Sequence, residues 1–359
     1  MSNSVTNRQM FFIIVLTLTA YTTIDIPKRM AEAAGRSSWI PILVSCVVFA
    51  LAAVIITKLN NMFQGKVFFD YSQQIIGKFL TYLIGVCFIL YFFIIGIYLK
   101  LELVGMLSSN FLPQTPKFVM LAFSIPIFAY VSYKGITNIA RLFEICGAMF
   151  VIITLGICLL MVSQGMSENV RPFYNPNEAK RFWNEASRFL TPFGGIEVLL
   201  IIPFTPINKK APRVAFFTLI FIGLFYVLIV ESTIMMLGVN NTMAYNESFI
   251  EAIKIVEAPV IERTDMFYLT FGLLSLFTGM IIVFTLIVEF ACKIFSKAKR
   301  IIIVVAIGIL FYVLTMFSFN AEHIKSVYDS FMPYLVLVFS IFIPTIIFIV
   351  AKVKKRIAG

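Results

Sequence analysis

A carboxylate lies inside one of the most apolar stretches of this chain. Residues 189–203 read FLTPFGGIEVLLIIP, and Glu197 lies near the centre. An ionisable group at membrane depth costs about 3 kcal/mol, so it indicates a functional site. The alternative is a proline-kinked packing helix in which Glu197 bonds to a neighbouring helix. The residues that oppose a continuous helix here are Thr191, Pro192, Gly194 and Gly195. Of these, Thr191, Gly194 and Gly195 join Glu197 as candidate ligand contacts.

The first apolar run, about residues 10–34, has a polar interruption of its own. A ligand ammonium or hydroxyl group could hydrogen-bond at this interruption. Alternatively, Asp25 pairs with Arg29 one turn later, and the threonines bond to carbonyls of the preceding turn. The side chains concerned, just before Pro27, are Tyr21, Thr22, Thr23 and Asp25.

A third group of polar residues follows helical spacing. Tyr91, Tyr98 and Glu102 lie at i, i+7 and i+11, which places them on one helix face. If that face lines a cavity, the two tyrosines contact the ligand; otherwise they form an aromatic packing stripe. Lys100 points elsewhere and is expected to extend its ammonium to the membrane surface.

Two further acids, Glu231 and Glu289, fall within apolar runs. In a proton-coupled carrier such groups would titrate. The alternative for Glu289 is a position close to water beside Lys293, and for Glu231 a pairing across helices.

Composition indicates an integral membrane protein and leaves no room for a large soluble domain. Of 359 residues, 60% are hydrophobic and 13% charged. Although the net charge is +11, the basic residues occupy joints between apolar runs, which argues against nucleic acid as a partner. The five cysteines lie in apolar runs without a CxxC pair and are expected to be core residues. We find no catalytic motif and expect no enzyme, metal or cofactor.

Apolar runs recur along the whole chain and predict an all-α polytopic protein with about ten membrane-spanning helices. Short surface helices are expected near residues 71–76 and 248–256. Lys and Arg gather at alternate joints, so both termini are predicted to be cytoplasmic. The predicted spans are 10–34, 39–57, 79–107, 118–133, 139–162, 189–203, 214–237, 266–292, 301–319 and 331–351.

The positions of the two interruptions predict how the spans are organised. Spans one and six are both broken, and each opens a block of five. Because five is odd, the second block enters the membrane from the opposite side, as in an inverted repeat whose broken helices meet at the midplane around a small-molecule site. We therefore expect a single membrane domain over 1–359, with repeats at about 8–163 and 188–352.

Several joints together resemble a known family, the B subunits of nutrient germinant receptors from endospore-forming bacteria. This family is a branch of the amino acid-polyamine-organocation transporter superfamily. The matching stretches follow nearly the whole chain in order: Ile26-Pro27 with Ala34-Gly35 and Trp39; Leu112 to Pro116; Tyr133-Lys134-Gly135 with Ala140-Arg141 and Glu144; Phe193 to Glu197 with Pro203-Phe204; and Glu262 to Asp265.

The resemblance implies a LeuT-type fold, residence in the spore inner membrane, and assembly with an A subunit and a C-subunit lipoprotein. It also implies a central site that senses a nutrient, usually an amino acid, without necessarily transporting it. Ala20 and Thr22 stand where the family often has glycine, which would narrow the pocket and leaves nucleosides or sugars as alternative ligands. An amino-acid permease and a scaffold with a vestigial pocket are the competing functions.

Overall fold

The computed structural model describes residues 5–63, 65–174, 189–202, 208–257, 263–317 and 321–357, without the side chains of residues 21, 22, 321–326 and 355–357. Within these ranges all regular secondary structure is helical. In this described part of the chain, six helices are long and apolar enough to cross a membrane by length and composition. The chain is therefore a multi-pass membrane protein, as composition predicts.

The first half of the chain follows the predicted order of spans. A capping box at Thr6 and Gln9 starts the first helix, which ends at the expected interruption. The short helix predicted near residues 71–76 begins three residues earlier. The helices are α1 (Asn7–Thr22), α2 (Ile26–Ala34), α3 (Trp39–Met62), α4 (Phe68–Ile76), α5 (Lys78–Asn110), α6 (Lys117–Lys134) and α7 (Ile136–Gln164).

The second half starts with the broken segment and contains a further bend. Two short 3-10 turns, Thr191–Phe193 and Ile196–Ile201, flank Gly194 and Gly195. The span predicted to end at residue 237 leaves helical geometry there, because Gly238 has a non-helical backbone with φ of 76°, and a second helix follows this kink within α9. The helices of this half are α9 (Ala211–Ala244), α10 (Ser248–Ile255), α11 (Thr264–Ile294), α12 (Arg300–Met316), α13 (Ala321–Val336) and α14 (Ile343–Ile357).

The last span is longer and less regular than the sequence predicts. A π-helical segment, Leu337–Phe342, joins α13 to α14. Such segments are uncommon and occur frequently at functional sites.

Corresponding spans of the two halves lie against one another. Helix α3 packs along α9, α5 along α11, and α6 along α12. The two broken segments also contact each other, since α1 touches both 3-10 turns. The second, third and fourth spans of the first half thus lie against the seventh, eighth and ninth.

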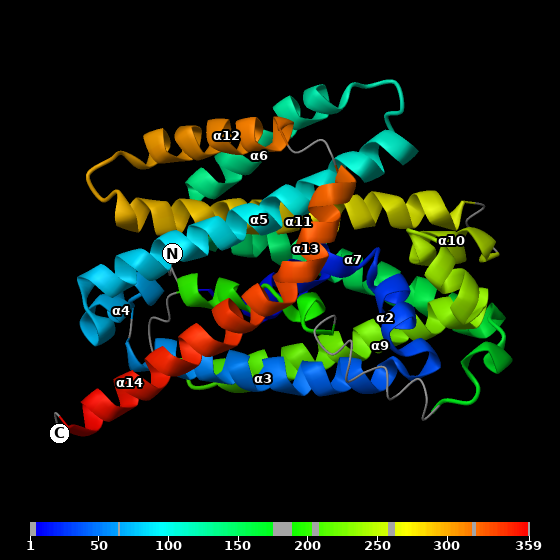
Figure 1. The fold of residues 1–359 in the computed structure, drawn as a ribbon, viewed down its shortest axis with the longest axis horizontal. Helices are drawn as coiled ribbons and strands as arrows, with labels where there is room; N and C mark the ends of the chain where they lie inside the picture. The colour runs from blue at the N-terminus through cyan, green and yellow to red at the C-terminus, as the bar shows by residue number, and fades with distance from the viewer. Residues whose placement is uncertain are drawn as a thin grey trace.

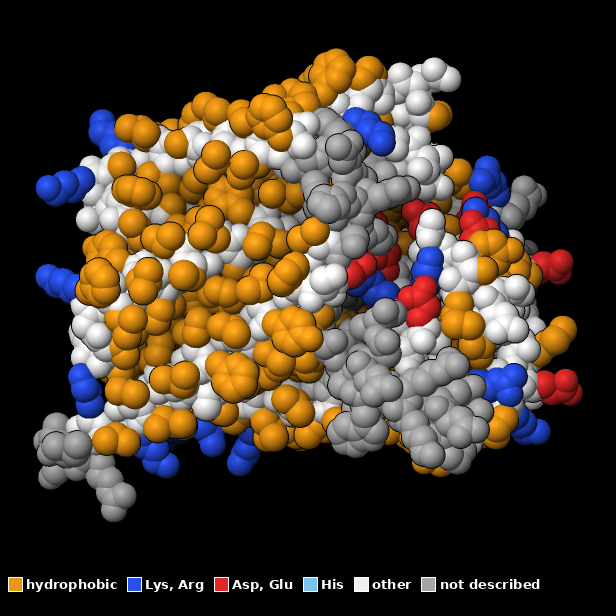
Figure 2. All heavy atoms as spheres, viewed as in Figure 1, with side chains coloured by type: hydrophobic (Ala, Val, Ile, Leu, Met, Phe, Trp, Pro, Cys, Tyr) orange, Lys and Arg blue, Asp and Glu red, His pale blue; other side chains and the backbone are white. Residues whose placement is uncertain are grey.

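One end of the molecule collects positive charge. Both chain termini and the α3–α4 and α11–α12 joints lie toward this end, on the left of Figure 1. Figure 2 shows Lys and Arg along the same edge, a broad apolar belt beside it, and carboxylates toward the opposite side. We call this edge the basic end.

Candidate functional site

The first break comprises residues 23–25, between α1 and α2. Pro27 lies in the first turn of α2, where its missing N–H group removes no helical hydrogen bond. The Thr23 hydroxyl donates to the carbonyl of Thr19, which is the local bonding expected of a threonine without a ligand. The side chains of Tyr21 and Thr22 lie outside the described residues, so their role stays a prediction.

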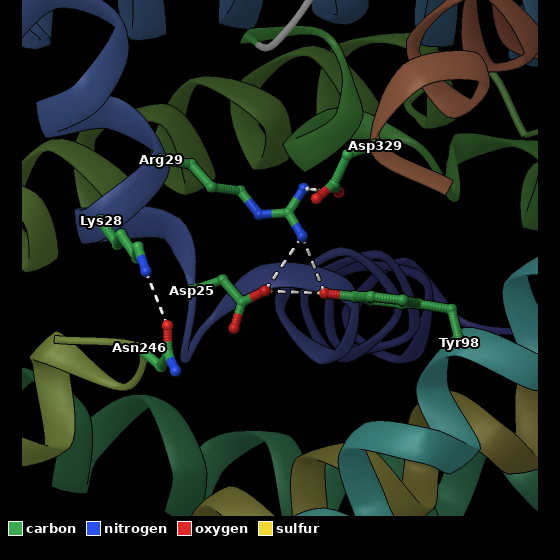
Figure 3. Close-up of polar contacts among 6 residues, drawn as sticks. All are labelled: Asp25, Lys28, Arg29, Tyr98, Asn246 and Asp329. Carbon is green, nitrogen blue, oxygen red and sulfur yellow. Dashed lines mark hydrogen bonds and ion pairs between the residues drawn. The ribbon is translucent and has the colours of Figure 1, made fainter. Parts of the chain in front are cut away.

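Asp25 forms hydrogen bonds with Tyr98 and Arg29. Its Oδ2 atom accepts hydrogen bonds from the Tyr98 hydroxyl at 2.7 Å and from Arg29 Nη2 at 3.0 Å. Arg29 also donates to the Tyr98 hydroxyl at 3.0 Å and forms an ion pair of 2.6 Å with Asp329. Figure 3 shows the guanidinium between the Asp25–Tyr98 pair and Asp329, while Lys28 points away to Asn246. The internal Asp25–Arg29 pair is therefore present, as one part of a network that joins α2, α5 and α13.

Aromatic packing holds this network in place. The ring of Tyr98 stacks on Tyr328 with centroids 3.9 Å apart and an interplanar angle of 7°. Tyr328 precedes Asp329 in α13, so stacking fixes the same turn that supplies the carboxylate. The geometry of the network thus depends on both α5 and α13.

The second break is built around Gly195 and Glu197. Gly195 has φ of 121°, a conformation that side chains rarely permit. The Glu197 carboxylate is fully buried and accepts hydrogen bonds from the Gly195 N–H at 2.7 Å and the Tyr91 hydroxyl at 2.8 Å. The Ser340 hydroxyl, in the π-helical segment, is a third donor. These donors compensate the desolvation of a carboxylate that is otherwise enclosed by apolar atoms.

The two remaining predicted contacts lie beside this carboxylate. The Gly194 N–H donates to the Thr191 carbonyl at 3.0 Å, which closes the 3-10 turn. Val336 packs so closely on Gly194 that an added Cβ would lie 2.8 Å from its Cγ2 atom. The last span therefore contacts the second break at Gly194 as well as at Glu197.

A small cavity of about 20 Å³, the room of a single water molecule, opens at the first break. Of the predicted site residues, it brings together Thr23, Asp25 and Tyr98. Tyr91 and Glu197 belong to the hydrogen-bonded cluster of the second break. The cavity is lined by Thr19, Ala20, Thr23, Ile24 and Asp25 of the first broken segment, Tyr98 and Glu102 of α5, and Tyr268, Gly272, Ser275 and Leu276 of α11.

Helix α11 supplies a wall that our sequence analysis missed. Tyr268 is fully buried, and its hydroxyl has no hydrogen-bond partner among the described residues. Such a group costs free energy until something bonds to it. Tyr268, Gly272 and Ser275 are spaced i, i+4 and i+7, so helical periodicity was the available signal.

The departure noted at Ala20 has a structural counterpart. Ala20 lines the cavity and lies opposite Gly279 of α11, where an added Cβ would come within 2.3 Å of the Ala20 methyl group. Helices α1 and α11 can approach this closely only because position 279 has no side chain. The methyl group of Ala20 thus occupies space at the cavity wall.

The other charged groups within the membrane spans have varied surroundings. Glu231 accepts a long hydrogen bond of 3.4 Å from Ser38, and Glu289 pairs with Arg300 at 2.6 Å. Lys293 pairs with Asp70 of α4 at 2.8 Å and lines a shallow hollow together with Glu289.

The prediction for Lys100 was wrong. Its side chain is 2% exposed, and its Nζ atom is buried without a hydrogen-bond partner among the described residues. Lys100 follows Phe93 by two helical turns, on the α5 face that packs against α12 through the Phe93–Phe311 stack. Helix packing at this position prevents the ammonium from extending to the surface.

Two expectations from the sequence concern metal binding and the burial of the cysteines. In the described ranges, no three His, Cys, Asp or Glu side chains gather closely enough to hold a metal ion. Cysteines 46, 146 and 158 are buried as expected, but Cys87 is exposed on α5, so that part of the core prediction was wrong.

Known proteins share this chain's sequence pattern and its fold. Residues 4–324 match the Spore_permease family, described as spore germination protein. The chain belongs to this family. Spore germination protein YndE of Bacillus subtilis (strain 168) is 24% identical, covering 99% of this chain and 98% of its own. Spore germination protein KB of the same organism is also 24% identical, covering 97% and 95%.

The fold of this spore germination protein is that of a transporter. It resembles MHP1, a nucleobase-cation-symport-1 family transporter solved in a closed conformation with bromovinylhydantoin bound, with a TM-score of 0.63. The match covers 92% of this chain and 77% of MHP1 at 10% identity, so the likeness concerns the fold alone. The predicted LeuT-type arrangement with broken first and sixth spans is confirmed.

Proposed function

We propose that this spore germination protein is the nutrient-sensing membrane subunit of a germinant receptor. The observation that carries the proposal is the cavity at the first break, where the Tyr268 hydroxyl, without a hydrogen-bond partner in the described ranges, lies in one wall with Asp25 and Tyr98 in the others. A buried polar group without a partner favours a ligand that completes its hydrogen bonding.

The chemistry of the cavity favours a small amino compound such as an amino acid, and its walls would move apart on binding, because the space between them here is about 20 Å³. Asp25 and Glu102 are carboxylates that would attract an ammonium group, and Tyr98 and Ser275 offer hydroxyls. Ala20, Ile24 and Leu276 provide an apolar surface for a small side chain. Nucleosides and sugars are the alternative ligands, and the screen and binding measurement described below distinguish them from amino acids.

A sensing subunit needs two arrangements that bind the ligand differently, because a ligand with equal affinity for both shifts nothing. The network of Asp25, Arg29 and Asp329 links the cavity wall to α13. We propose that ligand binding at Asp25 alters this network and so biases the position of the last span. The A subunit and the C-subunit lipoprotein would read that change in the spore inner membrane, with both termini of this chain in the cytoplasm.

The first experiment is a screen of amino acids, nucleosides and sugars on spores that lack this chain. The nutrient whose response is lost is then titrated against the purified protein by thermal shift, since a ligand that binds only the folded state raises its melting temperature. Binding of an amino acid that is weakened by Asp25→Asn, but not by Glu231→Gln, supports the proposal. If spores that lack this chain still respond to every nutrient in the screen, the proposal is contradicted.

The second candidate function is an amino-acid permease, which the likeness to a transporter fold favours. Proteoliposomes that contain only this chain distinguish the two. Accumulation of the nutrient inside the vesicles supports the permease. Binding without uptake, together with a germination response that requires the A and C subunits, supports the receptor. Absence of binding as well as uptake would indicate a scaffold with a vestigial pocket.

A further inference from the structure

A second hollow lies on the outside of the helix bundle, far in sequence from the breaks. Helices α6 and α12 form the upper edge of the molecule in Figure 1. An apolar groove of about 570 Å³ lies between them. This groove belongs to neither break and has no part in the proposed sensing function.

Small side chains open the groove between two helices that remain in contact. Ala122, Pro126 and Ala129 face it from α6, and Gly308 lies opposite on α12. A Cβ at Gly308 would meet Ile125 at 3.4 Å, so the floor is closed by packed side chains. Because a helix with side chains is about 10–12 Å wide, a furrow between two touching helices accepts an extended chain more readily than a third helix.

Basic residues lie at one end of the groove. Tyr133 and Ile301 mark this end, and the Arg300 guanidinium there donates to the carbonyl of Ser132 at 2.9 Å. Arg300 is already paired with Glu289, whereas Lys134 and Lys299 are exposed. The Lys134 ammonium lies 5.3 Å from the centroid of the Tyr130 ring, which lines the groove.

The length of the groove matches one leaflet of a membrane. From Ile301 to Tyr312 a helix rises about 16 Å, and half of the hydrocarbon core of a bilayer is about 15 Å. The charged end lies at the basic end of the molecule, because α12 starts at the α11–α12 joint. An acyl chain in the groove would therefore place its headgroup beside Lys134 and Lys299.

We propose that the groove between α6 and α12 binds an anionic phospholipid, with an acyl chain along the groove and the phosphate on Lys134 and Lys299. Basic residues at the surface attract anionic lipids, and the apolar walls hold the chain without a polar cost. The site would favour anionic over zwitterionic lipid, since only the net negative headgroup gains from both lysines.

The test uses the full-length protein in nanodiscs that contain phosphatidylglycerol or phosphatidylcholine with a photoreactive group on the acyl chain. Cross-links are mapped by mass spectrometry. We expect phosphatidylglycerol to label peptides of α6 and α12 above the other lipid-facing helices, and above the labelling by phosphatidylcholine. Lys134→Gln with Lys299→Gln should lower that labelling about tenfold or more.

Two matched controls make the result specific. Lys78→Gln with Lys210→Gln removes two exposed basic residues away from the groove and should leave the labelling unchanged. Ala129→Phe should reduce labelling by filling the groove, whereas Ile127→Phe, on an exposed α6 position outside it, should not. Equal labelling by both lipids, or around the whole bundle, would overturn the proposal. So would loss of labelling when the partner subunits are present, which would assign the groove to a partner helix.

Discussion

Arg29 and Asp329 come from opposite ends of the chain and form an ion pair of 2.6 Å. The pair joins the helix that follows the first break to the last span. Eleven residues further along, the same span supplies Ser340 to the buried carboxylate of the second break. The last span thus contacts both broken segments. A change in the structure of either break would therefore alter the contacts of the last span.

Loss of the Arg29–Asp329 pair should weaken the nutrient response without abolishing it. Arg29 is 16% exposed and Asp329 44%, and partly exposed pairs contribute modestly. We expect Asp329→Asn to raise the nutrient concentration for half-maximal germination by about 3- to 5-fold. Adding Arg29→Gln tests the coupling, because the double variant should show less than the product of the single effects. Independent effects would argue against a shared role.

Adding a side chain at Gly194 or Gly195 in the second break should abolish signalling. A Cβ at Gly194 would clash with Val336, and Gly195 has a φ of 121° that costs another residue about 1–3 kcal/mol. We expect spores with Gly194→Leu or Gly195→Leu to lose the nutrient response while the protein accumulates, measured by germination assay and immunoblot. Gly156→Leu is the control, since its Cβ would meet nothing within 4 Å. A normal dose-response curve for both break variants would contradict the prediction.

Glu197 should matter for stability as well as for signalling. Its carboxylate accepts hydrogen bonds from Tyr91, Ser340 and the Gly195 N–H. The side-chain NH2 group of glutamine in its place would face these donors, so hydrogen bonds would be lost. Glu197→Gln should destabilise the protein by about 1–3 kcal/mol, and Tyr91→Phe by less. Thermal unfolding in detergent measures both. Glu231→Gln, with one long hydrogen bond to lose, is expected to have little effect.

Tyr268→Phe separates ligand binding from folding. The hydroxyl has no partner in the described part of the protein, so its removal should leave the melting temperature unchanged or slightly higher. If the nutrient bonds to it, the half-maximal concentration should rise about 3- to 10-fold. Tyr245→Phe, at an exposed position, serves as the control. An unchanged response would remove Tyr268 from the ligand site.

Lys100→Met should stabilise the protein. The buried ammonium has no hydrogen bond among the described residues, and methionine fills a similar volume without a charge. We expect the melting temperature to rise by a few degrees. Lys78→Met, at an exposed position on the same helix, should change it little. A lower melting temperature for Lys100→Met would mean that the ammonium has a stabilising partner.

Local sequence signals were sufficient for most of the helices and for both interruptions. Pro27 and the Gly194-Gly195 pair act on the backbone beside them, so their effect is readable without knowledge of the neighbours. Lys100 shows where such reasoning fails. Its exposure depends on α12 packing against the same face of α5, which sequence separation conceals.

The sequence by itself determined that this chain crosses a membrane, where its first and sixth spans break, and which buried residues can ionise. Each of these follows from the hydrophobicity and backbone preferences of a short stretch. Only the tertiary structure decided that Asp25 meets Tyr98, that Arg29 pairs with Asp329, and that Ser340 bonds to Glu197. It also decided that Tyr268 lines the cavity without a hydrogen-bond partner among the residues that the structure describes. Hydrogen bonds act over about 3 Å, so partners remain undefined until folding brings distant segments within that distance.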